Sequence, residues 1–151
     1  MASTNLYTLP KNVCSLSQRI TDIRESSIWR YFKSMNAGDF ETTAAMFAPD
    51  GVLNAPFEDP IVGREAIVPY LQAEAKEMEL DPREGVSQKL QDGNTEMLII
   101  GKVDTPLFGV NVSWQFILNS REEIVSVTVK LLAEPQELLI LRSQTKFAGS
   151  L

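Results

Sequence analysis

Two aromatic residues with a hydrogen-bond donor at the tip, Tyr31 and Trp114, are the most informative side chains of the sequence. Each falls on an apolar stripe of its segment, so each can place one O–H or N–H group inside a nonpolar pocket. Two such donors suit a carbonyl oxygen, which only accepts hydrogen bonds. The pair therefore predicts a site that binds a ketone.

The composition removes the usual agents of catalysis and of metal binding. The 151 residues contain no histidine, which is the commonest general base and zinc ligand, and a single cysteine, Cys14. One cysteine allows no intrachain disulfide and no thiolate metal cluster, so Cys14 is either an inert thiol or a link between two chains. We expect no catalytic residue and no metal site.

Length, charge and hydropathy limit the class of protein further. A chain of 151 residues with 44% hydrophobic and 23% charged residues suits one globular domain. The net charge of −6 argues against a nucleic-acid partner, which would require clustered Lys and Arg. We see neither a membrane span nor a secretory signal in residues 1–13, and we expect a cytoplasmic protein.

The spacing of apolar residues predicts helices in the first half of the chain. Apolar residues from Ile20 to Met35 recur at helical spacing and bring Tyr31 beside a buried stripe. Asn36-Ala37-Gly38 ends this helix, and Asp39 can cap the next one. The helices expected on this basis span about 21–37, 40–48 and 64–79, with a short strand at 52–54 and a stop at Pro82.

The second half predicts strands, because it is rich in β-branched and aromatic residues. The expected strands are Thr95–Val103, Phe108–Leu118 and Glu123–Leu132. In the middle strand, apolar and polar residues alternate from Val110 to Leu118, and this period of two puts Trp114 on the inner face. A last helix is expected from Gln136 to about Arg142, either as a cap on the sheet or as a lid that moves when a ligand enters.

Helices followed by antiparallel strands indicate an α+β domain. We expect a strongly bent antiparallel sheet with helices across its open side and a short C-terminal helix, which together form a cone with a pocket at its mouth. The expected boundaries are a flexible arm over 1–18, the domain over 19–142 and a tail over 143–151.

Two stretches of the sequence resemble the nuclear transport factor 2-like superfamily, which includes ketosteroid isomerases and SnoaL-like cyclases. The first consists of residues 29–40, which contain Asn36-Ala37-Gly38-Asp39-Phe40, followed by residues 45–51. The second is Pro60-Ile61-Val62-Gly63 with the four residues that follow. The resemblance implies the cone fold and says little about activity, because this fold has many activities.

A more specific resemblance covers nearly all of residues 25–142. Its motifs lie at 36–40, 56–57, 60–63, 101–109 and 131–139, and they are similar to the C-terminal domain of the cyanobacterial orange carotenoid protein. The chain looks like a stand-alone homologue of that domain. The resemblance implies a homodimer that binds a ketocarotenoid of the echinenone or canthaxanthin type, quenches singlet oxygen and exchanges pigment with helical carotenoid proteins in photoprotection.

The same resemblance implies roles for single residues. Tyr31 and Trp114 match the pair that donates to the keto oxygen of the carotenoid ring, and Glu74 matches an acid that pairs with an arginine of the partner helical domain. Leu107 stands where the family often has Trp, and the segment Phe108–Trp114 is shorter than in the family. The residues expected to line the pocket are Met35, Leu80, Val103, Thr105, Pro106, Leu107, Phe108, Val112 and Phe116.

A comparison with the ketosteroid isomerases favours binding without reaction. Those enzymes place two donors on the carbonyl oxygen and use a carboxylate to move the neighbouring proton. Tyr31 and Trp114 match the two donors, whereas the place of the carboxylate falls at or next to Ala55. Glu58 or Asp59 of the following loop is the substitute to consider. We therefore expect a non-enzymatic protein.

Two alternatives of other classes stay open. One is a small-molecule isomerase or dehydratase of the same fold. The other is a dimerising interaction module with an unused pocket, in which Trp114 only fills the core.

The size of the domain predicts how a long ligand is accommodated. A domain of this length has a radius of gyration of about 15 Å, so its cone cannot enclose a whole carotenoid. The exposed half would be an apolar liability that a second subunit can cover. We expect a homodimer around one pigment, with transient membrane contact during pigment uptake.

Overall fold

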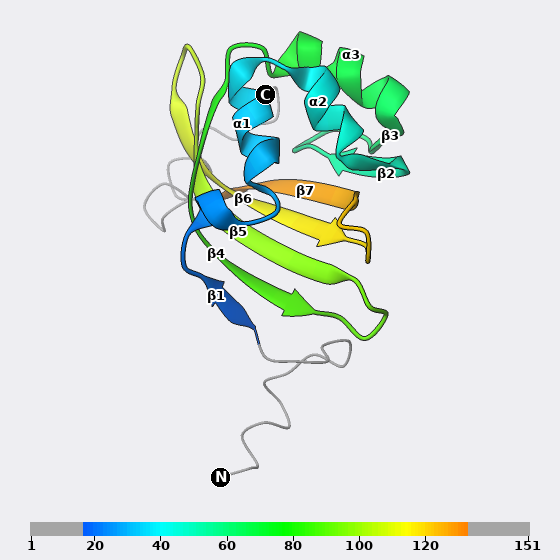
Figure 1. Ribbon diagram of the computed structural model, residues 1–151. Helices are drawn as coiled ribbons and strands as arrows, with labels where there is room; N and C mark the ends of the chain where they lie inside the picture. Colours follow the sequence, from blue (N-terminus) through cyan, green and yellow to red (C-terminus); the bar gives the residue numbers. More distant parts are fainter. Residues whose placement is uncertain (1–16, 133–151) are drawn as a thin grey trace.

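The computed structural model describes residues 17–132, which form a strongly bent seven-stranded sheet with helices across its concave side (Figure 1). The helical elements are the 3-10 helix η2 (Ile23–Glu25), α1 (Trp29–Ala37), α2 (Phe40–Ala45) and α3 (Arg64–Glu74). The strands are β1 (Gln18–Ile20), β2 (Phe47–Asn54), β3 (Ile61–Val62), β4 (Glu79–Lys89), β5 (Thr95–Asp104), β6 (Gly109–Leu118) and β7 (Ile124–Leu132). This arrangement confirms the α+β cone expected from the sequence.

The strand order is β1-β4-β5-β6-β7-β2-β3, and neighbouring strands are antiparallel except for β2 and β7. The parallel pair joins Val52 to Ser126 and Asn54 to Thr128, with a register shift between Phe47 and Val52. It therefore attaches β2, which lies between α2 and α3 in the chain, to the last described strand.

The alternation of side chains along β6 follows the expected period of two except at Ser113, a polar position that is also buried. Val112, Trp114, Phe116 and Leu118 are buried, whereas Asn111 and Gln115 are only partly covered. The buried set faces the helices, because α1 buries its own Tyr31, Phe32 and Met35 in the same core. Trp114 is thus fixed on the concave face.

Aromatic rings form the centre of this core. Phe32 meets Trp114 at a centroid distance of 4.9 Å and an interplanar angle of 83°. Tyr31 meets Phe116 at 5.0 Å and 85°. Such edge-to-face contacts contribute about 0.5–1.5 kcal/mol each beyond the area that they bury. They hold the rings of Tyr31 and Trp114 in defined positions.

The junction between α1 and α2 explains why the chain turns after Ala37. Gly38 adopts φ 74°, a left-handed conformation that ends α1 at low cost because glycine has no Cβ. Asp39 then caps α2 and accepts hydrogen bonds from the Thr42 backbone N–H and, at 2.6 Å, from the Thr42 hydroxyl. These bonds hold the pKa of Asp39 below its ordinary value.

A side-chain amide joins the end of α1 to the sheet. Asn36 Nδ2 donates to the Leu80 carbonyl at 2.8 Å, and the Leu80 N–H donates to Asn36 Oδ1 at 2.7 Å. Next to this point, β4 and β5 approach closely at Gly101, where a Cβ would collide with the Asp81 carbonyl oxygen. The helix and the bent strands are therefore held together by groups that tolerate little change.

Several element boundaries differ from the expected ones. The helix expected over 21–37 is interrupted, because the Ser26 hydroxyl donates to the Ile23 carbonyl at 2.6 Å and the chain is extended there. The helix expected over 40–48 ends at Ala45, since β2 begins at Phe47, and the helix over 64–79 ends at Glu74.

Strand β4 (Glu79–Lys89) was not expected at all. It contains Pro82 and Gly85, which normally argue against a strand. The register shifts between Pro82 and Glu84, so Pro82 lies at an irregular point of the pairing where it is tolerated. The short strands β1 and β3 were missed as well.

Parts of the predicted boundaries cannot be compared with the structure. Of the expected arm over 1–18, residues 1–16 lie outside the described residues, and Gln18 already belongs to β1. The expected helix Gln136–Arg142 and the tail over 143–151 lie outside them too. No helix within residues 17–132 is long and apolar enough to span a membrane.

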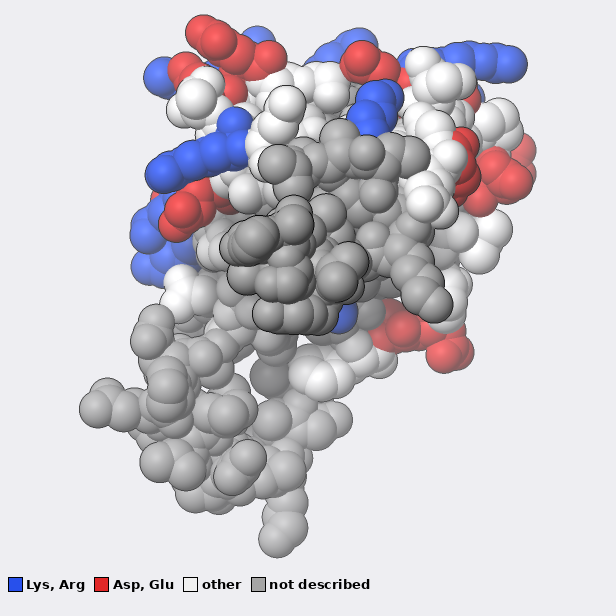
Figure 2. Space-filling view, turned by 90° about the horizontal axis from the view of Figure 1, so that it is seen from below, with Lys and Arg blue, Asp and Glu red and all other residues white. Residues whose placement is uncertain are grey.

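Basic and acidic side chains lie next to one another at the edges of the face seen from below (Figure 2). Three ion pairs of the described surface link Arg24 to Asp22, Arg83 to Asp81 and Lys102 to Asp104, at 3.2, 3.1 and 3.7 Å. Exposed pairs of this kind contribute about 0–1 kcal/mol each. The fold therefore depends on its core much more than on its surface charges.

Candidate ligand-binding site

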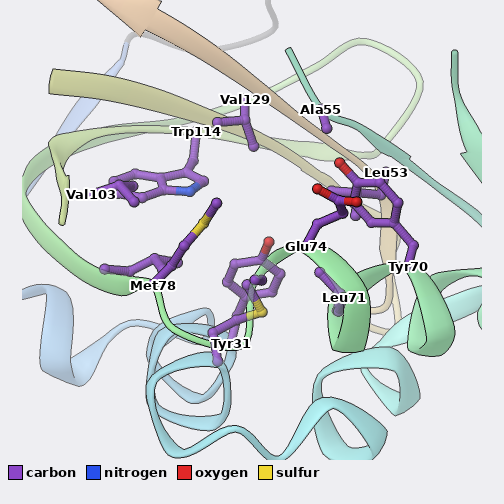
Figure 3. Close-up of a pocket in the computed structure, with 13 residues that line it drawn as sticks. Tyr31, Leu53, Ala55, Tyr70, Leu71, Glu74, Met78, Val103, Trp114 and Val129 are labelled. Carbon is purple, nitrogen blue, oxygen red and sulfur yellow. The ribbon is translucent and has the colours of Figure 1, made fainter. Parts of the chain in front are cut away.

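A small apolar cavity of about 100 Å³ lies between the helices and the concave face of the sheet. Its walls come from α1, the end of β2, α3, the segment after α3, and the strands β4 to β7 (Figure 3). The lining residues are Tyr31, Met35, Leu53, Ala55, Tyr70, Leu71, Glu74, Ala75, Met78, Leu80, Val103, Trp114 and Val129.

The cavity brings together the two donors that the sequence singled out. Tyr31 and Trp114 are 2% and 1% exposed, and they reach the cavity from α1 and from β6. Figure 3 shows the phenol and the indole on two sides of one hollow, with the hydroxyl directed into it. The elements that carry them are far apart in the sequence and meet only because the sheet bends over α1.

Neither donor has a hydrogen-bond partner among the described residues. No completely occluded polar side-chain atom lacks a partner in residues 17–132. The Tyr31 hydroxyl and the Trp114 indole N–H belong to side chains that line the cavity, and no residue within 17–132 accepts a hydrogen bond from either of them. Two donors arranged in this way on one apolar hollow form a site that can accept a carbonyl oxygen.

Burial keeps the phenol of Tyr31 protonated. Removal from water raises the pKa of Tyr31 well above its ordinary value, and the neighbouring Tyr70 adds to the shift. The pKa of Tyr70 is also raised, first by burial and then by the nearby Glu58 and Glu74. Tyr31 can thus donate a hydrogen bond throughout the physiological pH range.

One carboxylate lines the cavity, and the sequence had assigned it another role. Glu74 was expected to contact a partner protein, yet it closes α3 at the wall of the cavity and is exposed to solvent. Figure 3 shows it on the Tyr70 side of the hollow, across from Trp114. Ala55 also lines the cavity; the resemblance to ketosteroid isomerases places their base at or next to this residue.

Of the nine residues expected to line the pocket beside the donors, Met35, Leu80 and Val103 do so. Val112 and Phe116 are instead packed within the core, and Phe116 contacts the rings of Tyr31 and Phe32. They do not line this cavity, because side chains on one face of a strand do not all reach the same hollow.

Thr105, Pro106, Leu107 and Phe108 were also expected in the pocket wall and do not line this cavity. They form the turn between β5 and β6, in which the Thr105 hydroxyl oxygen accepts hydrogen bonds from the N–H groups of Leu107 and Phe108 at 3.2 and 3.1 Å. The turn directs Leu107 outward, so its side chain is 87% exposed.

The sequence also missed residues that do form the wall. Tyr70, Leu71 and Ala75 lie in the helix that the sequence predicts over 64–79, but nothing in the sequence linked them to the pocket. Val129 could have been found from the strand register, because it pairs directly with Trp114. Met78 gave no signal, since it lies in no regular element.

Comparisons with known proteins agree with this geometry. A SnoaL-like domain matches residues 28–98. The orange carotenoid-binding protein of Limnospira maxima is 39% identical over 134 residues, which are 83% of this chain and 42% of that protein. The chain is a homologue of one domain of the orange carotenoid-binding proteins.

Solved structures of orange carotenoid proteins show the same relationship. The protein of Anabaena (Nostoc) sp., which was solved with bound canthaxanthin, is 38% identical to this chain with a TM-score of 0.71. The match covers 83% of this chain and 42% of that one. The protein OCP1 of Fremyella diplosiphon is 33% identical with a TM-score of 0.72, over 90% of this chain and 47% of that one. The chain thus spans less than half the length of these relatives, and the resemblance to their nuclear transport factor 2-like domain is confirmed.

Proposed function

We propose that the chain is a non-enzymatic ketocarotenoid-binding protein in which Tyr31 and Trp114 bind the keto oxygen of one carotenoid ring. The observation that carries the proposal is the convergence on one apolar cavity of two buried donors, neither of which has a hydrogen-bond partner among the described residues. The names of the relatives, orange carotenoid-binding proteins, support a carotenoid ligand, and the relative that was solved with canthaxanthin supports a ketocarotenoid. We assign a ligand of the canthaxanthin or echinenone type.

The hydrogen bonds to the ring and the burial of the polyene are expected to contribute unequally to the binding affinity. A hydrogen bond contributes about 0.5–1.5 kcal/mol net, so two donors contribute only a few kcal/mol and mainly orient the ring. Burial of apolar surface contributes about 25 cal/mol per Å². The polyene therefore provides most of the affinity, and the donors provide the preference for a ketone.

The wider role follows from the length of the ligand. A polyene that leaves this cavity needs cover, which we assign to a second copy of the chain in a homodimer. The exposed Leu107 and Phe108 follow the cavity residue Val103 by a few positions and offer apolar surface next to it. We further propose singlet-oxygen quenching and pigment exchange with helical carotenoid proteins, with Glu74 at the contact and with transient membrane contact during uptake.

The test is production of the chain in a host that makes canthaxanthin. We expect a coloured protein whose visible absorption band shifts when Trp114→Phe removes the indole donor. Trp29→Phe is the matched control, because Trp29 is the other tryptophan and does not line the cavity. A colourless but folded protein, or a band that Trp114→Phe leaves in place, would reject the proposal.

The dimer is tested on the same sample. Size-exclusion chromatography with detection of the pigment should show the colour in a particle of two chains. A pigment-bearing monomer would contradict the proposed homodimer while leaving the ring site intact.

Proton transfer on a bound ketone is the second candidate function, and Glu74 is the observation in its favour. A carboxylate at the cavity wall can in principle remove a proton next to the carbonyl. Glu74 is solvent-exposed, however, and it lies across the hollow from Trp114 (Figure 3). A β,γ-unsaturated 3-ketosteroid tests it: isomerisation that Glu74→Gln abolishes would make the chain an enzyme, whereas we expect no turnover.

A further inference from the structure

The cavity is too small for the ring that it is proposed to bind. Its volume is about 100 Å³, whereas pockets for small molecules usually measure about 300–1,000 Å³. At least one side chain of the wall must therefore move before a trimethylated cyclohexenone ring can reach the donors.

Most of the wall is held in place. The rings of Tyr31 and Trp114 are fixed by Phe116 at 5.0 Å and by Phe32 at 4.9 Å. Leu71 and Leu80 are buried on α3 and β4, and Leu80 is also bound to Asn36 through its backbone. These groups cannot turn away without a loss of core packing.

Met78 differs from all of these. It lies between the end of α3 and the start of β4, and it is only partly buried. Its backbone N–H donates to the Ala75 carbonyl at 3.2 Å in a turn. The side chain is unbranched and has three rotatable bonds, so it can change rotamer at low cost.

The close-up shows where this side chain points. Met78 reaches into the hollow with its thioether between the indole of Trp114 and the phenol of Tyr31 (Figure 3). This is the place that a ring must take if its keto oxygen is to meet both donors.

We propose that Met78 is the movable wall of the cavity and determines which ketone-bearing ring can enter. Its thioether fills the space between the donors when no ring is bound, and it turns aside as the ring arrives. This proposal rests on the proposed function and deepens it. The consequence is that both the bulk and the flexibility at position 78 control entry.

A short ring ketone tests the movement without the polyene. Isophorone (3,5,5-trimethylcyclohex-2-enone) resembles the end ring alone and can be titrated into the full chain labelled with ¹³C-methyl methionine. The chain has five methionines, and the signal lost in Met78→Ala identifies Met78. We expect the Met78 signal to shift on titration while that of Met97, which does not line the cavity, stays in place.

Uptake kinetics test the control of entry. Canthaxanthin in detergent micelles is mixed with the unliganded protein, and the visible band is followed over time. We expect Met78→Ala to take up pigment about 2- to 10-fold faster than the wild type, the factor that corresponds to the cost of an unfavourable rotamer. Met78→Ile keeps similar bulk but is stiff at χ1, and it should be slower by a similar factor.

Met97→Ala is the matched control for these rates. Met97 is buried in β5 outside the cavity, so the variant loses the same atoms from the core without opening the site. Its uptake rate should equal that of the wild type once circular dichroism shows that it is folded.

The outcomes separate this proposal from the proposed function. Suppose that the wild-type protein takes up canthaxanthin. The role of Met78 is then overturned, and carotenoid binding stays intact, if isophorone leaves the Met78 signal unmoved or if Met78→Ala and Met78→Ile take up pigment at the wild-type rate. If no canthaxanthin binds, the proposed function fails, and the isophorone titration alone decides the role of Met78: a shifted signal supports it and an unmoved one rejects it.

Discussion

Tyr31→Phe removes one oxygen atom from a ring that is otherwise fixed in the core. The edge-to-face contacts of the ring with Phe32 and Phe116, at 5.4 and 5.0 Å, do not involve the hydroxyl. The hydroxyl has no partner within the described chain, and a buried polar group without a partner costs about 1–3 kcal/mol. Because the cavity can admit some water, we expect the unliganded variant to be as stable as the wild type or more stable by up to about 1 kcal/mol.

The same change should weaken ligand binding. If the hydroxyl donates to the keto oxygen, its loss costs about 0.5–1.5 kcal/mol, which is about a 2- to 13-fold loss of affinity for canthaxanthin. Stability and affinity would then move in opposite directions, which a purely structural tyrosine does not produce. Tyr70→Phe is the control, because it removes the hydroxyl of the other cavity tyrosine, which is not a proposed donor.

Two measurements decide the matter. Urea denaturation of the pigment-free proteins gives the free energies of unfolding, and equilibrium titration with canthaxanthin gives the affinities. A loss of more than about 1 kcal/mol in the pigment-free Tyr31→Phe variant would show that the hydroxyl has a structural partner. An unchanged affinity would show that Tyr31 is not a donor to the ligand.

Three further predictions concern pH and packing. Burial raises the pKa of Tyr31 above its ordinary value of 10.0, so the unfolded chain loses the Tyr31 proton at a lower pH than the folded chain does. The free energy of unfolding should therefore fall above about pH 10, by up to about 1.4 kcal/mol per pH unit. Tyr31→Phe should make this fall of the free energy of unfolding shallower, and Tyr70, which is only partly buried, should contribute less. Equal slopes for the two proteins in denaturation at about pH 9 to 11 would contradict this. Asn36→Ala should cost about 1–3 kcal/mol, since it removes both hydrogen bonds to Leu80, and a neutral result in urea denaturation would mean that other contacts hold α1 to β4. Gly101→Ala should lower the free energy of unfolding by about 1–3 kcal/mol or more through a collision with the backbone of β4, and the melting temperature should fall with it. An unchanged melting temperature would mean that the two strands can separate at that point.

The sequence predicted the site best where the signal is local or carried by a motif. The alternation along β6 placed Trp114 on the inner face, and helical spacing placed Tyr31 beside the buried stripe of α1. Gly38 and Asp39 ended one helix and capped the next as their types predict. Each of these features depends on neighbours within a few residues.

The misses share a different physical cause. Phe47 is in a strand because it pairs with Ile124 at the other end of the domain, which no local pattern could show. β4 was missed because Pro82 and Gly85 argue against a strand, and only the irregular pairing with β5 accommodates them. The wall around Met78 likewise depends on how α3 sits over the sheet.

The parallel pairing of β2 with β7 affects the order in which parts of this protein can fold during synthesis. Leu53 receives its partner Val127 only after nearly the whole described chain has been made. Until β7 has been made, β2 lacks its parallel neighbour, and we expect apolar side chains such as Phe47, which are buried in the finished fold, to stay accessible to chaperones. Because closing so long a loop is slow, we expect the hollow at the end of β2 to form late in folding, after the chain has been made as far as Thr128.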